Sequence, residues 1–147
     1  MLQMRIYLDN CCYNRPFDNQ NQMKIRLETV AKLYIQSAVR KGIYDLVWSY
    51  MLDYENNENP YEDKKEAIQI WKNRAKQICK SSLLILQQSK IIESLGVRPK
   101  DALHIACAIQ SKCNYFITTD IRLTKKKIEG IKIINPIDFI REMEEIL

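Results

Sequence analysis

The chain has 147 residues, of which 46% are hydrophobic and 28% are charged, with only three glycines and four prolines. This length and composition indicate a single globular, helix-rich domain over residues 1–147, and the lack of any run of about 18 apolar residues argues against a membrane span. The formal charge of +5 permits nucleic acid as a partner without requiring it, and the N-terminus has no signal-peptide layout, so we expect a cytoplasmic protein.

The first half of the chain alternates strand and helix patterns. The stretch RIYLD is apolar and rich in β-forming residues, and it ends at Asp9 before a polar, asparagine-rich loop. Apolar residues then recur at spacings of three to five up to Gly42, which is typical of an amphipathic helix and its end. We expect a strand, a polar loop, a helix, a second strand and a short helix, at residues 5–9, 10–22, about 22–41, 44–49 and 51–57.

The second half of the chain contains more helix. A charged surface helix is followed by a helix that ends at Gly96, and then by the stretch RPKDALHIACAIQSK, an almost entirely small or apolar helix that Asp101 opens. Two apolar stretches separated by the basic turn RLTKKK are typical of strands. We expect three helices, two strands and a closing helix, at residues 62–79, 83–95, 98–112, 114–120, 131–136 and 137–147.

Strands that alternate with helices predict an α/β fold. We expect a three-layer α/β/α sandwich around a central, mainly parallel sheet of four or five strands. The five cysteines are odd in number and contain no C-x-x-C pair. We therefore expect buried, reduced thiols, because this pattern argues against both a disulfide framework and a zinc site.

Four carboxylates fall where such a sheet binds its ligands, outside the carboxyl ends of its strands. Asp9 and Asp120 close predicted strands, Glu55 follows another strand within a short helix, and Asp101 begins the apolar helix. Taken singly, each has a structural explanation as a helix cap, a turn residue or a solvated side chain. Gathered at one edge, however, they would repel one another unless a cation or protons intervened.

A divalent cation would resolve that repulsion. Carboxylate oxygens suit Mg²⁺ or Mn²⁺, which use few protein ligands and keep room for waters and substrate phosphates. A metal in such a site lowers the pKa of a bound water and stabilises charge on phosphate oxygens, which is the chemistry of phosphodiester hydrolysis.

Four stretches of the chain, in order, resemble the PIN domain. They are YLDNCCYNRPF, SYMLDYE with its S-x5-E spacing, KDALHIACA and ITTDIRL, and the resemblance runs over nearly the whole chain. Toxin-type PIN ribonucleases of prokaryotes look most similar in length and layout. The resemblance implies an Mg²⁺- or Mn²⁺-dependent endoribonuclease with an RNA substrate, an antitoxin protein as partner of such a toxin, and a homodimer.

Carried over residue by residue, the resemblance implies an acidic cluster of Asp9, Glu55, Asp101 and Asp120. Asp9 and Asp101 would hold the metal directly, Asp120 directly or through a water, and Glu55 would orient or deprotonate the attacking water. The implied products carry a 5′-phosphate and a 3′-hydroxyl. One departure is Arg122, which stands where many family members have another acid, so a second metal would bind weakly or only with substrate.

Seven further residues are candidates for supporting the site or contacting RNA. The threonines could bind a carboxylate or phosphate, or simply suit a strand, and the single histidine could move a proton or lie in the core. The basic residues could neutralise RNA phosphates or belong to solvated turns. The candidates are Asn10, Arg15, His104, Thr118, Thr119, Arg122 and Lys125.

The sequence fits other functions less well than a nuclease. A phosphatase with a strand-end nucleophile would need a second acid two residues after Asp9, where Cys11 stands, and no convincing acid set of a receiver domain is present. The remaining alternative is a catalytically silent PIN fold that binds nucleic acid or protein, and Arg122 is the feature that supports it.

Overall fold

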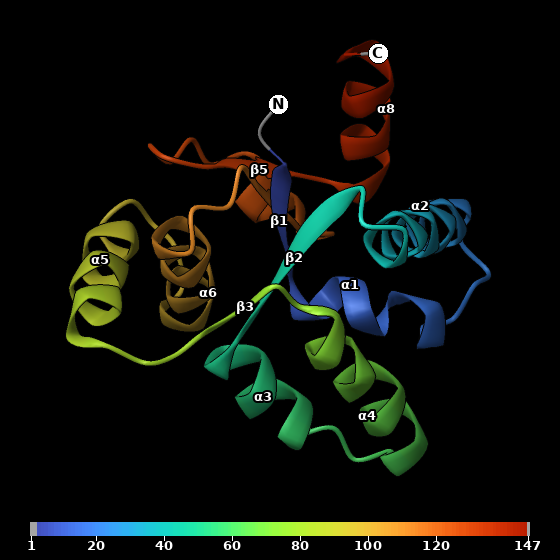
Figure 1. Cartoon of the computed structure of the whole chain (residues 1–147), viewed down its shortest axis with the longest axis horizontal. Coiled ribbons are helices and arrows are strands. Elements are labelled where there is room, and N and C mark those ends of the chain that lie inside the picture. Colours follow the sequence, from blue (N-terminus) through green and yellow to red (C-terminus); the bar gives the residue numbers. More distant parts are fainter. Residues whose placement is uncertain (1–2, 147) are drawn as a thin grey trace.

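The computed structural model describes residues 3–146, which form one central sheet with helices around it (Figure 1). Within these residues the sheet has five strands, all paired in parallel. Their spatial order is β3 (Gln77–Cys79), β2 (Tyr44–Ser49), β1 (Met4–Leu8), β4 (Tyr115–Ile117) and β5 (Lys132–Ile134). The predicted α/β class and the parallel sheet are confirmed.

Helices cover both faces of the sheet. The α-helices of the described residues are α1 (Asn10–Asn14), α2 (Met23–Arg40), α3 (Tyr50–Asn57), α4 (Glu62–Gln69), α5 (Leu83–Glu93), α6 (Pro99–Gln110), α7 (Ile121–Thr124) and α8 (Pro136–Ile146). Two 3₁₀ helices join them, η1 (Arg15–Phe17) and η2 (Ile70–Arg74). Figure 1 shows α5 and α6 on one side of the strands, α2 and α8 on the other, and α3 and α4 beyond the carboxyl ends.

The core is centred on β1. Ile6, Tyr7 and Leu8 are fully buried, because β1 is paired on both edges and covered on both faces. All five cysteines are free, and four of them are buried as predicted, whereas Cys11 is only partly buried. Among residues 3–146, no helix is long and apolar enough to cross a membrane.

The prediction of one helix over residues 62–79 is wrong in its second half. The α-helix ends at Gln69, continues as η2, and gives way to the edge strand β3. The backbone N–H of Lys76 donates to the carbonyl of Leu46 at 2.8 Å, and β3 then pairs with the free edge of β2. Pairing with an existing strand outweighs the helical periodicity of this segment, since helix propensity is a weak prior that tertiary contacts override.

The loop expected at residues 10–22 is also partly helical. Asp9 caps α1 by accepting a hydrogen bond from the backbone of Asn10, and η1 follows directly. Cys12 and Tyr13 are fully buried on α1, so this polar-looking stretch is anchored in the core. The other elements lie where the sequence predicts them, except that the last two strands are shorter and the first half of the basic turn belongs to the helix α7. Leu147 lies outside the described residues.

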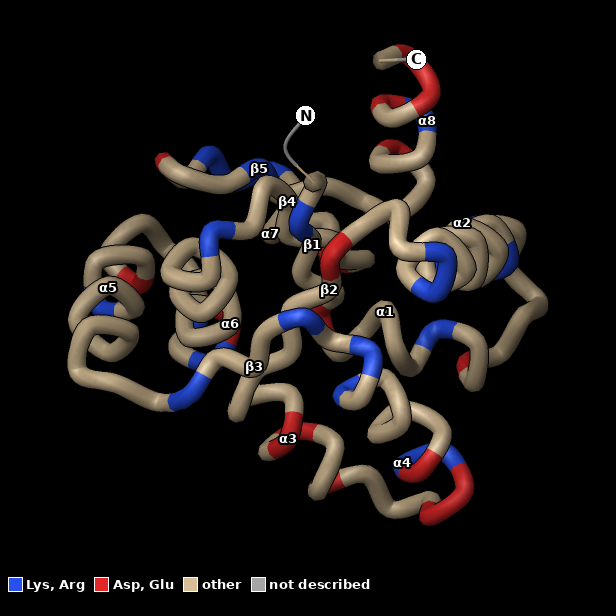
Figure 2. The backbone as a smooth tube through the Cα atoms, viewed as in Figure 1, with Lys and Arg blue, Asp and Glu red and all other residues tan. Residues whose placement is uncertain are grey.

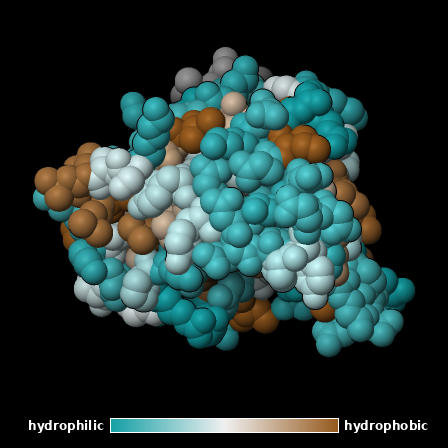
Figure 3. Space-filling view, turned by 90° about the horizontal axis from the view of Figure 1, so that it is seen from below, coloured by the Kyte–Doolittle hydropathy of each residue, from teal (hydrophilic) through white to brown (hydrophobic). Residues whose placement is uncertain are grey.

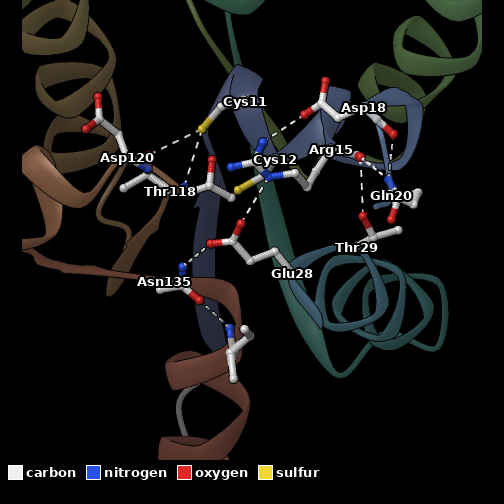
Figure 4. Close-up of polar contacts among 12 residues, drawn as sticks. Cys11, Cys12, Arg15, Asp18, Gln20, Glu28, Thr29, Thr118, Asp120 and Asn135 are labelled. Atoms are coloured by element: carbon white, nitrogen blue, oxygen red, sulfur yellow. Dashed lines mark hydrogen bonds and ion pairs between the residues drawn. The ribbon is translucent and has the colours of Figure 1, made fainter. Parts of the chain in front are cut away.

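The buried carboxylate of Glu28 ties three separate segments together (Figure 4). Glu28 is 0% exposed on α2, accepts a hydrogen bond from Nε of Arg15 at 3.1 Å, and accepts another from Nδ2 of Asn135 at 2.6 Å. These bonds connect α2 with η1 and with the turn between β5 and α8. They therefore fix the helical segment that follows Asp9 relative to the far edge of the sheet.

We predict that Glu28→Ala lowers the free energy of unfolding by about 3 kcal/mol, because it leaves the partly buried Arg15 guanidinium and the Asn135 amide without their shared acceptor. Urea unfolding measures this loss. The control is Glu66→Ala, which removes an exposed carboxylate of α4 and should change stability by no more than about 0.5 kcal/mol. Equal effects of the two substitutions would contradict this account of Glu28.

Candidate functional site

Four carboxylates lie at the carboxyl edge of the sheet, and each comes from a different element. Asp9 follows β1, Glu55 lies on α3, Asp101 lies on α6, and Asp120 precedes α7. Their proximity is evident at Asp101, because the charges of Asp9, Asp120 and Glu55 all act on its carboxyl group. Figure 3 views this edge of the molecule, which is mostly hydrophilic, with an apolar patch at the end formed by α5.

Asp9 is almost completely buried and is held by several donors. One carboxylate oxygen accepts the backbone N–H of Asn10 at 2.8 Å, and the other accepts the hydroxyl of Thr118 at 2.9 Å and the thiol of Cys11 at 3.5 Å. Thr118 is itself fully buried and also accepts the backbone N–H of Asp120 at 3.1 Å. Thr118 thus links the two strand-end aspartates through one hydroxyl.

Asp120 is paired with a nearby cation. Arg122 donates from Nε to Oδ1 at 3.3 Å and from Nη2 to Oδ2 at 3.2 Å, and its backbone N–H donates to the same carboxylate at 2.9 Å. Partial burial raises the pKa of Asp120, but these bonds to Arg122 outweigh it, so the net shift is downward. The arginine that replaces the expected acid therefore neutralises Asp120.

Asp101 has no such partner. It lies in the first turn of α6, where Arg98 rather than Asp101 is the N-cap residue, and within residues 3–146 its carboxylate forms no hydrogen bond or ion pair. Burial raises the pKa of Asp101, and the charge of Asp9, followed by those of Asp120 and Glu55, raises it further, against an opposing effect of His104. Asp101 is therefore a half-buried carboxylate without a partner among residues 3–146, and its ionised form is disfavoured by burial and by the charges of three other acids.

Glu55 is fixed by a buried chain of hydrogen bonds. Its carboxylate bonds to Nε2 of His104, whose Nδ1 lies 2.5 Å from the hydroxyl of Tyr7. That hydroxyl lies 2.5 Å from Oγ of Ser49, which accepts the backbone N–H of Leu52 and so caps α3. When the ring is neutral and Nε2 donates to the carboxylate, Nδ1 accepts the hydroxyl hydrogen of Tyr7.

His104 is a buried member of this series of hydrogen bonds and does not face solvent. It is 1% exposed, and burial lowers the pKa of its imidazole. The hydrogen bond to Glu55 and the negative charges of Asp9, Glu55 and Asp101 more than offset burial, so its pKa is raised. The buried position matches the core interpretation of His104, while its bond to Glu55 makes it part of the site.

The remaining candidates are placed as follows. Arg15 is engaged by Glu28 and by Asp18, whose carboxylate accepts its Nη1 at 2.8 Å, and Lys125 is exposed at the end of α7. Thr119 contributes its backbone N–H to the sulfur of Cys11 at 3.4 Å. Asn10 supports Asp9 through its backbone, and its buried side-chain oxygen has no hydrogen-bond partner.

Three residues of the site were not among the sequence candidates. The sequence gives no sign that the hydroxyl of Tyr7 bridges two other side chains, because Tyr7 reads as an ordinary strand residue. Ser49 was visible as the first residue of the S-x5-E spacing, and a serine at a strand end is a common helix cap. Cys11 is recognisable only once Thr118 and Asp9 are known to lie beside it.

The carboxylate oxygens of this site are of the type that binds a divalent cation such as Mg²⁺. Within residues 3–146, no three His, Cys, Asp or Glu side chains are gathered closely enough to hold a metal by themselves. Mg²⁺ does not need such a cage, since it commonly binds one or two carboxylates and completes its shell with water and substrate phosphates. Asp101, unpaired, and Asp9, which has hydrogen-bond donors on both oxygens, are the side chains that would supply this minimal set.

A comparison with models of protein families identifies the family of this chain. The model of the PIN domain matches residues 6–129, which include all four carboxylates. The chain belongs to the PIN domain family. Its family and its fold are thus those that the resemblance in the sequence implies.

A solved structure has the same fold as this PIN domain. A chain in the crystal structure of VapBC2 from Rickettsia felis, bound to a DNA fragment from their promoter, superposes with a TM-score of 0.56 at 15% sequence identity. The alignment covers 90% of this chain and 98% of that chain. No curated protein sequence matches this PIN domain.

We predict that Asp101→Asn raises the melting temperature by a few degrees in EDTA, because it removes one of the mutually repelling charges. Mn²⁺ should raise the melting temperature of the native protein and have little effect on the variant. Differential scanning fluorimetry with and without Mn²⁺ measures both effects. The matched control is Asp138→Asn in the first turn of α8, which removes an ion pair with Arg141 far from the site, should not raise the melting temperature in EDTA, and should leave the response to Mn²⁺ unchanged. An Asp101→Asn protein that Mn²⁺ still stabilises would refute the role of Asp101.

Proposed function

We propose that this PIN domain is a divalent-metal-dependent endoribonuclease that hydrolyses RNA phosphodiester bonds. PIN domains are generally nucleases that use divalent metal ions, which supports the reaction class. The observation that carries the proposal is the carboxylate of Asp101, which has no partner among residues 3–146, lines a cavity together with Asp120, and is acted on by the charges of Asp9, Asp120 and Glu55. Mg²⁺ or Mn²⁺ bound there would lower the pKa of a water and stabilise charge on the scissile phosphate.

The protein's own residues would divide the work as follows. Asp9 and Asp101 would hold the cation, with Asp120 contributing directly or through a water once RNA draws Arg122 away. Glu55 would orient the attacking water or accept its proton, and His104 and Tyr7 would keep the Glu55 carboxylate in place. The products would carry a 5′-phosphate and a 3′-hydroxyl.

Basic residues near Asp101 are suited to the RNA backbone. A cavity of about 110 Å³ is lined by Asp101 and Asp120 together with Arg98, Arg122 and Lys126. These three cations would neutralise phosphates next to the cleaved bond, so RNA affinity should fall as salt rises. Lys125 is exposed and would act on a more distant part of the strand, whereas the guanidinium of Arg15 is already engaged by Glu28 and Asp18.

The structural neighbour supports an inference about the biological role of this protein. Because a related fold occurs in a VapBC complex, we infer that this protein acts as a cytoplasmic toxin that an antitoxin protein restrains. We also infer a homodimer, since α5 exposes large apolar side chains that a second copy would cover, namely Leu83, Leu84, Leu86 and Ile91.

One observation favours a second candidate, a catalytically silent PIN fold that binds RNA or protein. Arg122 occupies the carboxylate of Asp120 with two guanidinium bonds, which lowers the negative charge available to a metal. In that case the protein would bind its partner without cutting it.

Purified protein incubated with a mixed pool of labelled RNAs tests the two candidates. We predict cleavage with Mn²⁺ or Mg²⁺, no cleavage in EDTA, and no cleavage by Asp101→Asn, whereas Asp138→Asn should remain as active as the native protein. Folded native protein that leaves the whole pool intact in both metals, while still binding RNA, would favour the silent candidate.

A further inference from the structure

A second cavity, of about 260 Å³, lies beside the acidic site. It is formed by η1 together with the end of α3 and the start of α4, and Glu55 lies in its wall. A nucleotide next to the bond that is cut would therefore be within reach of this cavity. Its lining includes aromatic, amide and carboxylate groups, which is the mixture that holds an unstacked base.

Two aromatic rings and one cation form the open side of the cavity. Phe17 is 40% exposed and Tyr61 is 58% exposed, and the ammonium of Lys64 lies 5.8 Å and 4.2 Å from the centres of their rings. Exposed aromatic rings of this kind serve as stacking platforms for bases, and a cation over an exposed ring is only weakly held. A base that displaced Lys64 from Tyr61 would leave the ammonium free to pair with a phosphate.

The polar groups of the cavity are mainly hydrogen-bond acceptors. Glu58 is exposed and forms no ion pair within residues 3–146, whereas Asp18 is already paired with Arg15. Asn56 is 1% exposed, and its Oδ1 has no hydrogen-bond partner although its Nδ2 donates twice. Figure 2 shows the acidic residues of α3 and the start of α4 on this part of the molecule.

The walls of the cavity are held in place before any ligand binds. Asp53 of α3 accepts hydrogen bonds from Trp48 at 2.9 Å, from Gln69 of α4 at 3.2 Å and from Lys72 of η2 at 3.0 Å. Asn56 of α3 also donates to Gln69. These bonds lock α3 against α4, so a ligand would bind with little reorganisation.

We propose that this cavity binds one unstacked guanine base of a single-stranded RNA, stacked on Tyr61 and Phe17, with its Watson–Crick edge against the carboxylate of Glu58. Guanine presents two adjacent donors on that edge, N1–H and the N2 amino group, which match the two acceptor oxygens of a carboxylate. Adenine, cytosine and uracil each offer a single donor group on that edge, next to at least one acceptor that would face the carboxylate. The inference rests on the proposed ribonuclease function and adds a base preference beside the cleaved bond.

Fluorescence anisotropy with labelled RNA hexamers in EDTA tests the proposal without cleavage. The four probes are uridine hexamers whose fourth position is G, A, C or U. We predict that the G probe binds about tenfold more tightly than the others, that Tyr61→Ala removes about this factor, and that Glu58→Gln removes the preference for G. The matched control is Tyr34→Ala, which removes an equally exposed tyrosine (59%) from α2 and should change no affinity.

Several outcomes would overturn the proposal. Equal or undetectable binding of all four hexamers would do so, as would a Tyr34→Ala effect as large as that of Tyr61→Ala. A labelled arginine-rich peptide that requires Tyr61 for binding, when no hexamer does, would assign the cavity to a protein partner instead.

Cleavage of the same hexamers in Mn²⁺ separates this proposal from the ribonuclease function. Cutting without any base preference, by native protein and Tyr61→Ala alike, would leave the nuclease intact and remove the guanine site. A Tyr61-dependent preference for G in EDTA, without cleavage in any metal, would leave the guanine site intact and remove the nuclease.

Discussion

Electrostatic repulsion among four carboxylates at one edge of the sheet is the constraint around which this site is organised. Asp9 is relieved by donors from Asn10, Thr118 and Cys11, and Asp120 by the guanidinium of Arg122. Glu55 is relieved by His104, and Asp101 alone has no partner among the described residues. The fold thus tolerates three of the four negative charges, and the charge of Asp101 is left without a compensating partner. Asp101 lines a cavity that also contains Arg98, Arg122 and Lys126.

The fold brings these groups together through ordinary packing. Parallel pairing aligns the ends of β1 and β4, which places Asp9 and Asp120 at the same edge, and Thr118 joins them. The buried hydroxyl of Tyr7, at the centre of the sheet, bonds to His104, which in turn bonds to Glu55 and so fixes the position of its carboxylate. A parallel sheet with short loops at its carboxyl edge thus provides a rigid base for a site whose chemistry resides in four side chains.

Most of the fold and the acidic set could be predicted from the sequence, because they depend on local periodicity and on order along the chain. The third strand in chain order could not, since Gln77–Cys79 becomes a strand only by pairing with β2. The hydrogen-bonding roles of Tyr7 and Glu28 depend on partners that are distant in sequence, such as His104 and Asn135. Local patterns indicate which residues are polar, but they do not indicate which polar groups meet in the interior.

Anomalous diffraction from crystals soaked with Mn²⁺ tests the central claim most directly, because it locates the cation independently of any activity. We predict a peak against the carboxylates of Asp9 and Asp101 in the native protein, and its loss in Asp101→Asn crystals treated in the same way. A cation bound elsewhere on the molecule, with none at this edge of the sheet, would contradict the view that these carboxylates form a metal site.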